Sequence, residues 1–468
     1  MRTHIKKIIS FALALAAAAL LAPAFAMPAR AETTAVRDRY EVSLSVSGTG
    51  KTLRVWGKMR VTYHNDSSDT LYTIVLRLHA NDVSKNCMSI DTVAAGGKSA
   101  VYTLNSSGSI LTVSLPMEIA PGESTDVFLR FDMTLPETGD RFGKNSTGFM
   151  LGNALPIVAM YENGAWRTDE YYSYGDSFFS RVSDYTVGMK VPSDYTLACS
   201  GTVAANEYMG GGYTRYYIKA ESAREFAFAV MSTQKTASAA ARNGRVTVYA
   251  AAETAAEAQF AAKCGAAAID YFSEKIGEYP YSSLWIVPFD LSGGMEYPGL
   301  IMIDKDDFKG ANQNSGALVI GHEAAHQWFY GAVGSDQINS PWLDESLVEY
   351  LGCDFLRQYI GESQTEALES ERYAYIRNGY TRTKRLDASL SELKEDYFYI
   401  VYGYGHEFYA ALVDKIGSGA FYEGLKTYFN ANYMGIGTKE KLISAFSEAA
   451  DTDLTSWFEA NIAVRGGQ

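Results

Sequence analysis

The sequence predicts an α+β protein in which antiparallel β-structure comes first and a mainly helical region follows. From about residue 40 to residue 233, β-rich runs such as YEVSLSV and TLYTIVLRLHA alternate with polar turns such as NDSSDT. From Ser315 onward the pattern is mainly helical and ends in TDLTSWFEANI. Short strands at this spacing favour an antiparallel sandwich or a saddle-shaped sheet.

The first 31 residues have the features of a secretory signal peptide. Basic residues precede the apolar run ISFALALAAAALLA, and small-residue cleavage sites follow at AFA and ARA. That run is too short and wrongly flanked for a stable transmembrane helix, and no later segment reaches about 18 apolar residues. We therefore expect residues 1–31 to be removed. The mature protein is then secreted, to the extracellular space or the cell envelope, without stable membrane insertion.

A domain boundary is predicted near residue 234. The segment TASAAARNG, within residues 234–244, is small and polar and reads as a linker. A strand at RVTVYAA and an alanine-rich helix at about residues 253–276 come next, and further strands are predicted at LWIVPF and MEYPGLIMI. We therefore predict a β domain at residues 32–234 and a second domain at residues 235–468.

Composition and charge exclude several classes of protein. The chain is 47% hydrophobic and 20% charged, which is typical of a folded globular protein. Its formal net charge is −13, and removal of a basic signal peptide makes it more negative, so nucleic acid is not an expected partner. Four cysteines are too few for a disulfide scaffold in a chain of 468 residues. No sequence feature indicates a particular oligomeric state.

The strongest chemical signal is the pentapeptide HEAAH. It lies on a predicted helix that Ser315 caps and that glycines end after Tyr330. Residues four apart share one helix face, so His322 and His326 can bind one ion at about 2.0–2.1 Å. Glu323 lies beside them and stays available for proton transfer.

Glu345 follows the second histidine by nineteen positions. We predict it one turn inside a second helix, which Ser340 caps and which carries Pro341 in its first turn. Two such helices packed antiparallel can bring the Glu345 carboxylate to the histidines. Three protein ligands and a water form the open tetrahedral arrangement of a catalytic zinc. A surface histidine pair on an ordinary amphipathic helix is the alternative, and the spacing to Glu345 disfavours it.

These residues resemble the gluzincin metallopeptidases of the aminopeptidase N and leukotriene hydrolase family. HEAAH, eighteen intervening residues and Glu345 within WLDES carry the likeness. The sequence from Gly293 to Tyr297, GGMEY, resembles the family's Gly-x-Met-Glu-Asn exopeptidase motif, with tyrosine in place of the more frequent asparagine. VYGYG places Tyr402 where the family's Tyr-x-x-Gly tyrosine lies, although the lysine of the commoner Tyr-Glu-Lys-Gly form is missing.

The resemblance, which spans most of the mature chain, implies a thermolysin-like catalytic domain at residues 235–468. It also implies one Zn²⁺ ion, whose ligands are His322, His326 and Glu345. By the same likeness, Glu323 is the general base that takes a proton from water and passes it to the leaving amine. Tyr402 donates a hydrogen bond to the oxyanion, and Tyr404 is the second candidate for that role.

The GGMEY segment predicts how a substrate binds. A carboxylate near zinc, that of Glu296, pairs with the protonated α-amino group of a peptide, so that only the first peptide bond meets the metal. Gly293 and Gly294 let the substrate backbone approach closely, and Met295 belongs to the same substrate-binding motif.

Glu349 lies one turn after Glu345 on the second predicted helix. It is expected to accept an N–H from His322 or His326 and so to orient a zinc ligand. A position on plain helix surface is the alternative.

The aromatic segment from Trp166 to Ser180 either lines a substrate cleft or packs as a tyrosine-rich loop against the sheet. Larger relatives continue beyond the end of this chain into a β-sandwich and a helical domain that covers the active site. We therefore expect a short form with a more open cleft.

Together these features favour a secreted zinc aminopeptidase that acts on peptides. A zinc endopeptidase with an open cleft is the main alternative. A non-catalytic peptide-binding protein is less favoured, because binding alone does not require the general base Glu323.

Overall fold

The computed structural model describes residues 36–464, with gaps at 49–52, 138–140, 233 and 291. All described residues belong to one compact unit. The predicted signal peptide at residues 1–31 therefore lies outside the described residues. Within the described ranges, no helix is long and apolar enough to cross a membrane.

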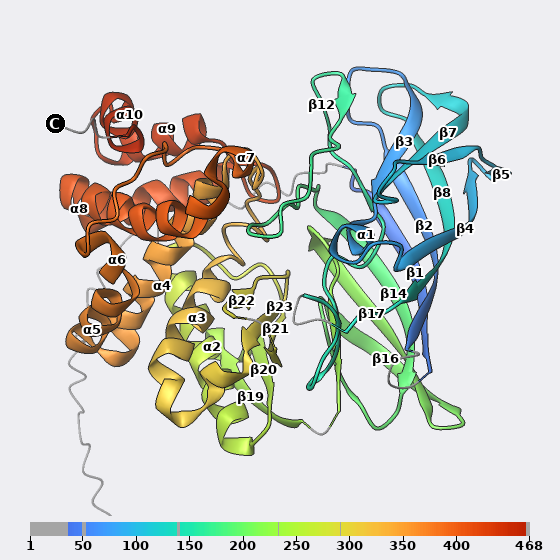
Figure 1. Ribbon diagram of the computed structural model, residues 1–468, viewed down its shortest axis with the longest axis horizontal. Helices are drawn as coiled ribbons and strands as arrows, with labels where there is room; N and C mark the ends of the chain where they lie inside the picture. The colour runs from blue at the N-terminus through green and yellow to red at the C-terminus, as the bar shows by residue number, and fades with distance from the viewer. Residues whose placement is uncertain (1–35, 49–52, 138–140, 233, 291, 465–468) are drawn as a thin grey trace, which may run out of the picture. The chain divides into compact units, whose positions relative to one another are not determined.

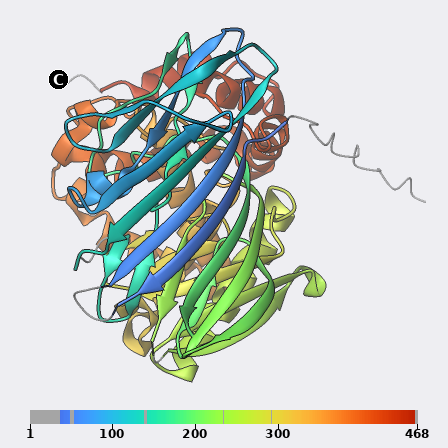
Figure 2. The ribbon, with the colours of Figure 1, turned by 90° about the vertical axis from the view of Figure 1, so that its right-hand side faces the viewer.

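The largest sheet has eight strands in the order β16-β17-β14-β1-β2-β8-β4-β5. Its neighbours are antiparallel except for the parallel pair β1 and β14. Figure 2 shows its long strands twisting across the view. The strands are β1 (Arg39–Ser47), β2 (Arg54–His64), β4 (Met88–Ala95), β5 (Lys98–Ser99), β8 (Ser124–Thr134), β14 (Ser183–Pro192), β16 (Thr202–Gly210) and β17 (Tyr213–Ala223).

Two four-stranded sheets and a small hairpin complete the first region, together with the short helix α1 (His79–Val83). One sheet contains β11 (Ile157–Val158), β3 (Leu71–Arg77), β7 (Ile110–Ile119) and β6 (Tyr102–Leu104). The other contains β15 (Thr196–Cys199), β18 (Phe228–Met231), β10 (Gly148–Leu151) and β9 (Phe142–Lys144). The hairpin pairs β12 (Tyr161–Glu162) with β13 (Ala165–Trp166). Strands such as β1 alternate buried and exposed residues, because successive side chains point to opposite faces.

The predicted linker at residues 234–244 is wrong, because this segment forms strand β19 (Lys235–Ala241) and a short 3₁₀ turn (Arg242–Gly244). β19 pairs with β20 (Val246–Ala252) at the edge of a five-stranded sheet. The other strands of this sheet are β21 (Ser283–Phe289), β22 (Gly294–Met295) and β23 (Leu300–Asp304). The small alanine side chains of β19 lie against helix α2 (Ala255–Lys275), which explains a composition that resembles a linker.

The rest of the chain is mainly helical, coloured from yellow to red in Figure 1. The helices after α2 are α3 (Gln313–Ala325), α4 (Glu345–Ile360), α5 (Glu362–Arg372), α6 (Ala374–Arg377), α7 (Leu390–Leu393), α8 (Gly405–Ala431), α9 (Lys439–Ala449) and α10 (Thr455–Ile462). Short 3₁₀ turns are η3 (Lys305–Phe308), η4 (Gly310–Asn312), η5 (Pro341–Leu343) and η6 (Lys394–Asp396), and η7 (Phe398–Tyr404) is a π-helix. The predicted α+β class, with strands before helices, is confirmed.

Two helix boundaries differ from the prediction. Helix α3 starts after Asn312, so Ser315 lies inside its first turn instead of capping it, and it ends at Ala325. The next residues close the helix end with bonds that span five residues, such as Gly331 N–H to His326 O at 2.8 Å. Ser340 precedes the 3₁₀ turn η5, and Glu345 is the first residue of α4.

The described apolar residues form three buried clusters. One draws on residues 40–230 and another on residues 241–462. The third contains residues of both regions, including Met150, Phe178, Met295 and Tyr297. The boundary predicted between residues 234 and 235 stays a prediction, since these regions share one compact unit.

The buried side chain of Arg224 also joins distant segments. Its guanidinium donates to the carbonyl oxygens of Ser180 at 2.6 Å, Tyr330 at 2.8 Å and Gly435 at 3.0 Å. Three hydrogen bonds to backbone carbonyls satisfy a charged group that is costly to bury alone.

Candidate active site

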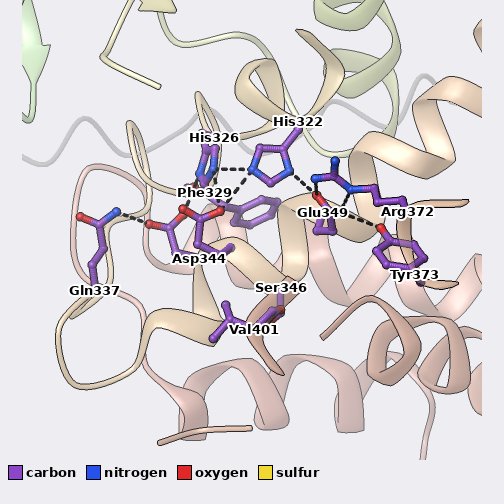
Figure 3. Close-up of polar contacts among 11 residues, drawn as sticks. His322, His326, Phe329, Gln337, Asp344, Ser346, Glu349, Arg372, Tyr373 and Val401 are labelled. Atoms are coloured by element: carbon purple, nitrogen blue, oxygen red, sulfur yellow. Dashed lines mark hydrogen bonds and ion pairs between the residues drawn. The ribbon is translucent and has the colours of Figure 1, made fainter. Parts of the chain in front are cut away.

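Three side chains converge where α3 meets α4 (Figure 3). His322 and His326 come from the end of α3, and their Nε2 atoms are 3.3 Å apart. Glu345, the first residue of α4, places Oε2 at 3.2 Å from the first Nε2 and 3.5 Å from the second. All three residues are buried. The predicted ligand set is therefore brought together.

Glycines allow the two helices to approach this closely. A methyl group at Gly321 would lie 2.5 Å from the Phe355 ring, and one at Gly352 would lie 3.1 Å from the backbone nitrogen of His322. Larger residues at these positions would push α4 and its carboxylate away from the histidines.

The donor set fits a zinc ion. In a tetrahedral site with bonds of about 2.0–2.1 Å, neighbouring ligand atoms are about 3.3–3.4 Å apart. The three separations between His322, His326 and Glu345, 3.2, 3.3 and 3.5 Å, lie around that value. Two imidazoles and one carboxylate that leave a fourth position open are also the chemistry of catalytic zinc sites.

Each histidine presents its other ring nitrogen to a carboxylate. Nδ1 of His326 lies 2.8 Å from Asp344 Oδ1, and Nδ1 of His322 lies 2.9 Å from Glu349 Oε2. A proton on Nδ1 leaves the Nε2 lone pair free for a metal. Burial lowers the pKa of His322, but Glu345 and Glu349 outweigh that effect and raise it to about 9, which shows that the site favours positive charge.

The two outer carboxylates are themselves fixed. Asp344 accepts a 2.6 Å bond from Gln337, and Glu349 accepts bonds from Arg372 at 2.5 Å and Tyr373 at 2.7 Å. Burial raises the pKa of Glu349, but Arg372 and His322 reverse this and hold it well below the usual range. The structure thus places Glu349 beside His322 and not on plain helix surface. The sequence analysis missed Asp344, although it directly precedes Glu345 in WLDES.

Glu323 lies next to this ligand set and is buried, with Oε2 unpartnered among the described residues. Burial raises the pKa of its carboxyl to about 7, while His322 and His326 oppose a further rise. Gly294 is packed against it, because a methyl group there would lie 2.3 Å from Glu323 Oε1. The predicted reason for Gly294 was close approach of substrate, whereas its nearest neighbour is the Glu323 side chain.

Tyr402 reaches the site from the π-helix η7. Its ring lies parallel to the His322 imidazole, with centroids 5.8 Å apart and an interplanar angle of 12°. Ser346 donates a 2.5 Å bond to the carbonyl of Val401 and so ties η7 to α4 (Figure 3). Tyr404 is turned elsewhere and donates to Tyr380 O at 2.7 Å.

Glu296 supplies a buried carboxylate near the metal ligands. It is 2% exposed, and its Oε1 lacks a hydrogen-bond partner in the described part of the chain. Carboxylate oxygens of Asp176, Glu296 and Glu345 lie within 4.8 Å of one another. Burial, and then the charge of Asp176, raises the pKa of Glu296 well above its usual value.

Asp176 was not predicted by residue. It is buried and lies 2.5 Å from a guanidinium nitrogen of Arg141. Burial raises its pKa to about 6, while Arg141 lowers it and Glu345 raises it further. Its only sequence signal was its place in the aromatic segment Trp166–Ser180, where it is the third acidic residue, after Asp169 and Glu170, and lies in no recognised motif.

The three predicted zinc ligands line one cleft with a volume of about 580 Å³, together with Glu296, Glu323 and Tyr402. Ser173, Tyr174 and Gly175 contribute to it, so the aromatic segment lines the cleft. Gly293 and Gly294 line it too, whereas Met295 is 1% exposed, belongs to the third apolar cluster and is absent from the described lining. The remaining lining residues include Leu318, Val319, Arg372, Tyr375, Tyr397, Phe398 and Tyr399.

Comparison with known proteins agrees with this geometry. Residues 260–460 match the family model described as the peptidase family M1 domain. That range contains the predicted ligands His322, His326 and Glu345, which the structure brings together. Residues 260–460 are therefore similar to the M1 family of zinc metallopeptidases.

Curated relatives of this chain include two bacterial proteins named aminopeptidase N. The one from Streptomyces lividans is 28% identical over 42% of this chain and 25% of its own length. The one from Lactobacillus helveticus is 30% identical over 42% of this chain and 26% of its own length. The chain thus spans about a quarter of the length of these relatives.

A solved structure supports the fold over a longer range. A mutant M1 zinc metallopeptidase from Deinococcus radiodurans superimposes with a TM-score of 0.68 and 17% sequence identity. The match covers 92% of this chain and 95% of that chain. The arrangement of β-sheets and helical region is therefore that of an M1 peptidase.

A second cluster in the described part of this chain also contains ligand-type side chains. Cys353, Glu369 and His406 offer atoms within 4.8 Å of one another. Both Glu369 oxygens accept hydrogen bonds from Arg357, at 2.6 and 2.7 Å, so this carboxylate already has a cationic partner. His406 thus lies in this second cluster and not among the predicted zinc ligands.

Proposed function

We propose that this chain is a secreted zinc aminopeptidase that removes N-terminal residues from peptides. The observation that carries the proposal is the buried carboxylate of Glu296, whose Oε1 has no partner among the described residues, near the His-His-Glu set. A buried ionised carboxylate is costly unless a cation pairs with it. The protonated α-amino group of a peptide supplies such a cation.

This pairing sets which bond is cut. The α-amino nitrogen and the first carbonyl of a peptide are separated by a single Cα atom, so an amine held by Glu296 brings the first peptide bond to the metal position. Asp176 lies close enough to Glu296 to share the same ammonium group. Two carboxylates around one cation favour a free N-terminus over an acetylated one.

The proposed chemistry uses the residues that surround the zinc position. His322, His326 and Glu345 would hold a Zn²⁺ ion, which would supply Lewis-acid activation of a water molecule and of the scissile carbonyl. Glu323 takes the proton of the attacking water and passes it to the leaving amine, a role that its pKa of about 7 suits. Tyr402 donates its phenolic hydrogen to the oxyanion of the tetrahedral intermediate.

Names and sequence features support the wider proposal. The curated relatives from S. lividans and L. helveticus are both named aminopeptidase N. The signal-peptide features of residues 1–31 support secretion to the extracellular space or cell envelope. Peptides are the substrate class that the M1 family domain implies.

A zinc endopeptidase is the second candidate, and one observation favours it. Phe398 and Tyr399 line the cleft, yet they are 59% and 41% exposed. Exposed aromatic residues along a cleft can bind peptide segments on either side of an internal bond. A protein that only binds peptides is disfavoured by Glu323, a buried carboxylate beside the ligands that binding alone does not need.

A mixture of peptides, each with a free and an acetylated N-terminus, tests the proposal. The zinc-loaded protein should trim only free termini, one residue at a time, and Glu323→Gln should retain zinc while losing this activity. Cleavage of acetylated peptides at internal bonds would instead identify an endopeptidase. A wild-type protein that does not bind zinc would contradict both candidate functions.

A further inference from the structure

We infer that Gln327 and Tyr297 are positioning residues that hold Glu296 at a fixed distance from the metal ligands. This inference rests on the proposed function, because it concerns how the free amine of a peptide is placed. Neither residue touches the reacting atoms. Both act through the backbone of residues 296–299.

Gln327 directly follows the zinc-ligand residue His326 and is fully buried, with 0% exposure. Its Nε2 donates to the carbonyls of Glu296 and Tyr297, both at 3.2 Å. Its Oε1 accepts from the backbone N–H of Gly299 at 2.8 Å. Both N–H bonds and the carbonyl of this amide are thus used on one four-residue segment.

Tyr297 fastens the same segment from the opposite direction. Its ring is fully buried, and its hydroxyl donates to Asn153 Oδ1 at 2.7 Å. Asn153 in turn donates to the buried carboxyl of Glu225. Gly152 makes room for the phenol, because a methyl group there would lie 1.9 Å from the Tyr297 oxygen.

The position of Glu296 therefore depends on its backbone more than on its side chain. Its Oε1 has no hydrogen bond to any described residue, so no side-chain contact of that atom fixes the carboxylate. The backbone around it is tied to His326 through Gln327 and to the β-rich region through Tyr297. A shift of this segment changes the distance between the amine anchor and the zinc ligands.

Tyrosine at position 297 acquires a physical reason from these contacts. The motif that this segment resembles has asparagine there more often, and an asparagine side chain is too short to reach Asn153 in the same way. The longer tyrosine side chain reaches Asn153, which in turn donates a hydrogen bond to Glu225. The hydrogen bond from Tyr297 to Asn153 thus compensates for the missing asparagine, and the segment that carries Glu296 stays fixed.

Two hydroxamates test the inference without relying on turnover. An amino acid hydroxamate and its N-acetyl derivative both chelate zinc, and only the first carries an ammonium group. The dissociation constant of the N-acetyl compound divided by that of the free-amine compound, both measured by calorimetry, therefore reports anchoring of the amine. Gln327→Met keeps the length of the side chain and removes its hydrogen bonds, and it should reduce this ratio about tenfold, as expected for a displaced anchor. The dissociation constant of the N-acetyl compound should not change.

Asn65→Leu provides a matched control. Asn65 is also a fully buried amide, which donates to Asp69 O at 2.8 Å and Ile119 O at 3.1 Å and accepts from Ser67 N at 3.1 Å. It lies in the β-rich region, so its loss should lower stability without changing the hydroxamate ratio. Tyr297→Phe, which removes a single hydroxyl, should lower the ratio about threefold and keeps the test informative if Gln327→Met does not fold.

The outcomes separate this inference from the proposed function. If the wild type binds both hydroxamates equally, Glu296 does not anchor an amine, and the proposed function fails together with the inference. If the wild type prefers the free amine, and Gln327→Met and Tyr297→Phe keep that preference, the positioning roles are wrong while the amine anchor stands.

Discussion

The Glu349 carboxylate faces Nδ1 of His322 at 2.9 Å and at the same time accepts hydrogen bonds from Arg372 and Tyr373. It is fully buried: Oε2 faces the histidine and also accepts from Arg372 at 3.2 Å, while Oε1 accepts from Arg372 and Tyr373. Through Nδ1, this contact orients the ring of His322, whose Nε2 is the proposed zinc-binding atom.

Glu349→Gln should weaken zinc binding by about 10–100-fold, the usual effect of losing such an outer carboxylate. The neutral amide keeps the shape but removes the charge that favours Nδ1–H on His322. Competition with a chelator of known zinc affinity measures the change. Glu371→Gln, at an exposed position on α5, should leave the affinity unchanged. Equal affinities for all three proteins would refute an orienting role for Glu349.

Gly294→Ala should impair catalysis without removing the metal. The added methyl group would lie 2.3 Å from Glu323 Oε1, so the proposed base must move. We expect kcat to fall at least about tenfold, because general-base catalysis contributes about 10²–10⁴-fold. Zinc content should stay at the wild-type level. A methyl group at Gly310 meets no described atom within 4 Å, so Gly310→Ala serves as the control.

Tyr402→Phe distinguishes the two tyrosines that the sequence left as candidates. Loss of an oxyanion donor costs about 10²–10³-fold in kcat, and we expect this for Tyr402 with little change in KM. Tyr404→Phe should retain kcat within a few-fold, because its hydroxyl is directed to Tyr380 O. Steady-state kinetics of both variants on one peptide with a free N-terminus show which tyrosine is the oxyanion donor. The opposite ranking would assign the donor role to Tyr404.

Arg224→Met should destabilise the fold strongly. The change leaves the carbonyls of Ser180, Tyr330 and Gly435 without this partner in a buried site, and each unsatisfied group costs about 1–3 kcal/mol. Urea unfolding should show a reduced midpoint. Arg60, an exposed residue of β2 that pairs with Glu41, is the control, and Arg60→Met should change stability by less than about 1 kcal/mol. Similar midpoints for both variants would show that Arg224 is not a structural tie.

Glu225 should make stability depend on pH. Burial raises its pKa to about 8, while Arg141 and Arg224 oppose the shift. Because the folded pKa lies above the unfolded value near 4.5, the stabilising contribution is complete below about pH 4.5 and is lost as pH rises through about 8.

Glu225→Gln has no proton to lose and should not follow this trend. The free energy of unfolding of the wild type should fall relative to the variant by up to about 1.4 kcal/mol per pH unit between pH 5 and pH 8. Urea titrations at four pH values within that window, at constant zinc, measure the difference. Parallel pH profiles would show that Glu225 is ionised in the folded protein.

The close approach of the three proposed metal ligands, His322, His326 and Glu345, was predictable because the information is local. Two histidines four residues apart share a helix face, and Glu345 starts the next long helix, so spacing and helix signals suffice. The α+β class followed similarly from strand and helix periodicity. The failures came from other sources. Residues 235–241 have the composition of a linker, yet tertiary pairing with β20 makes them a strand.

Residues that reach the candidate active site from distant parts of the sequence were not predictable. Asp176 reaches Glu296 across 120 positions of sequence, and no local pattern marks it as different from its acidic neighbours. In the sequence, Gln327 is marked only as the residue that follows HEAAH. Its amide donates hydrogen bonds to the carbonyls of Glu296 and Tyr297, some 30 positions earlier. Helix ends such as that of α3 at Ala325 depend on how the following residues close the turn, which propensity does not encode.

The direction in which the Tyr402 side chain points depends on the π-helical geometry of η7. A π turn holds one residue more than an α turn, and each residue of an α-helix advances the direction by about 100°. Deleting one residue anywhere before Tyr402 within Phe398–Val401 would restore an α turn and rotate the phenol away from His322 without altering any catalytic side chain. The count of residues in this short segment is thus as much a requirement of the site as the identity of the tyrosine.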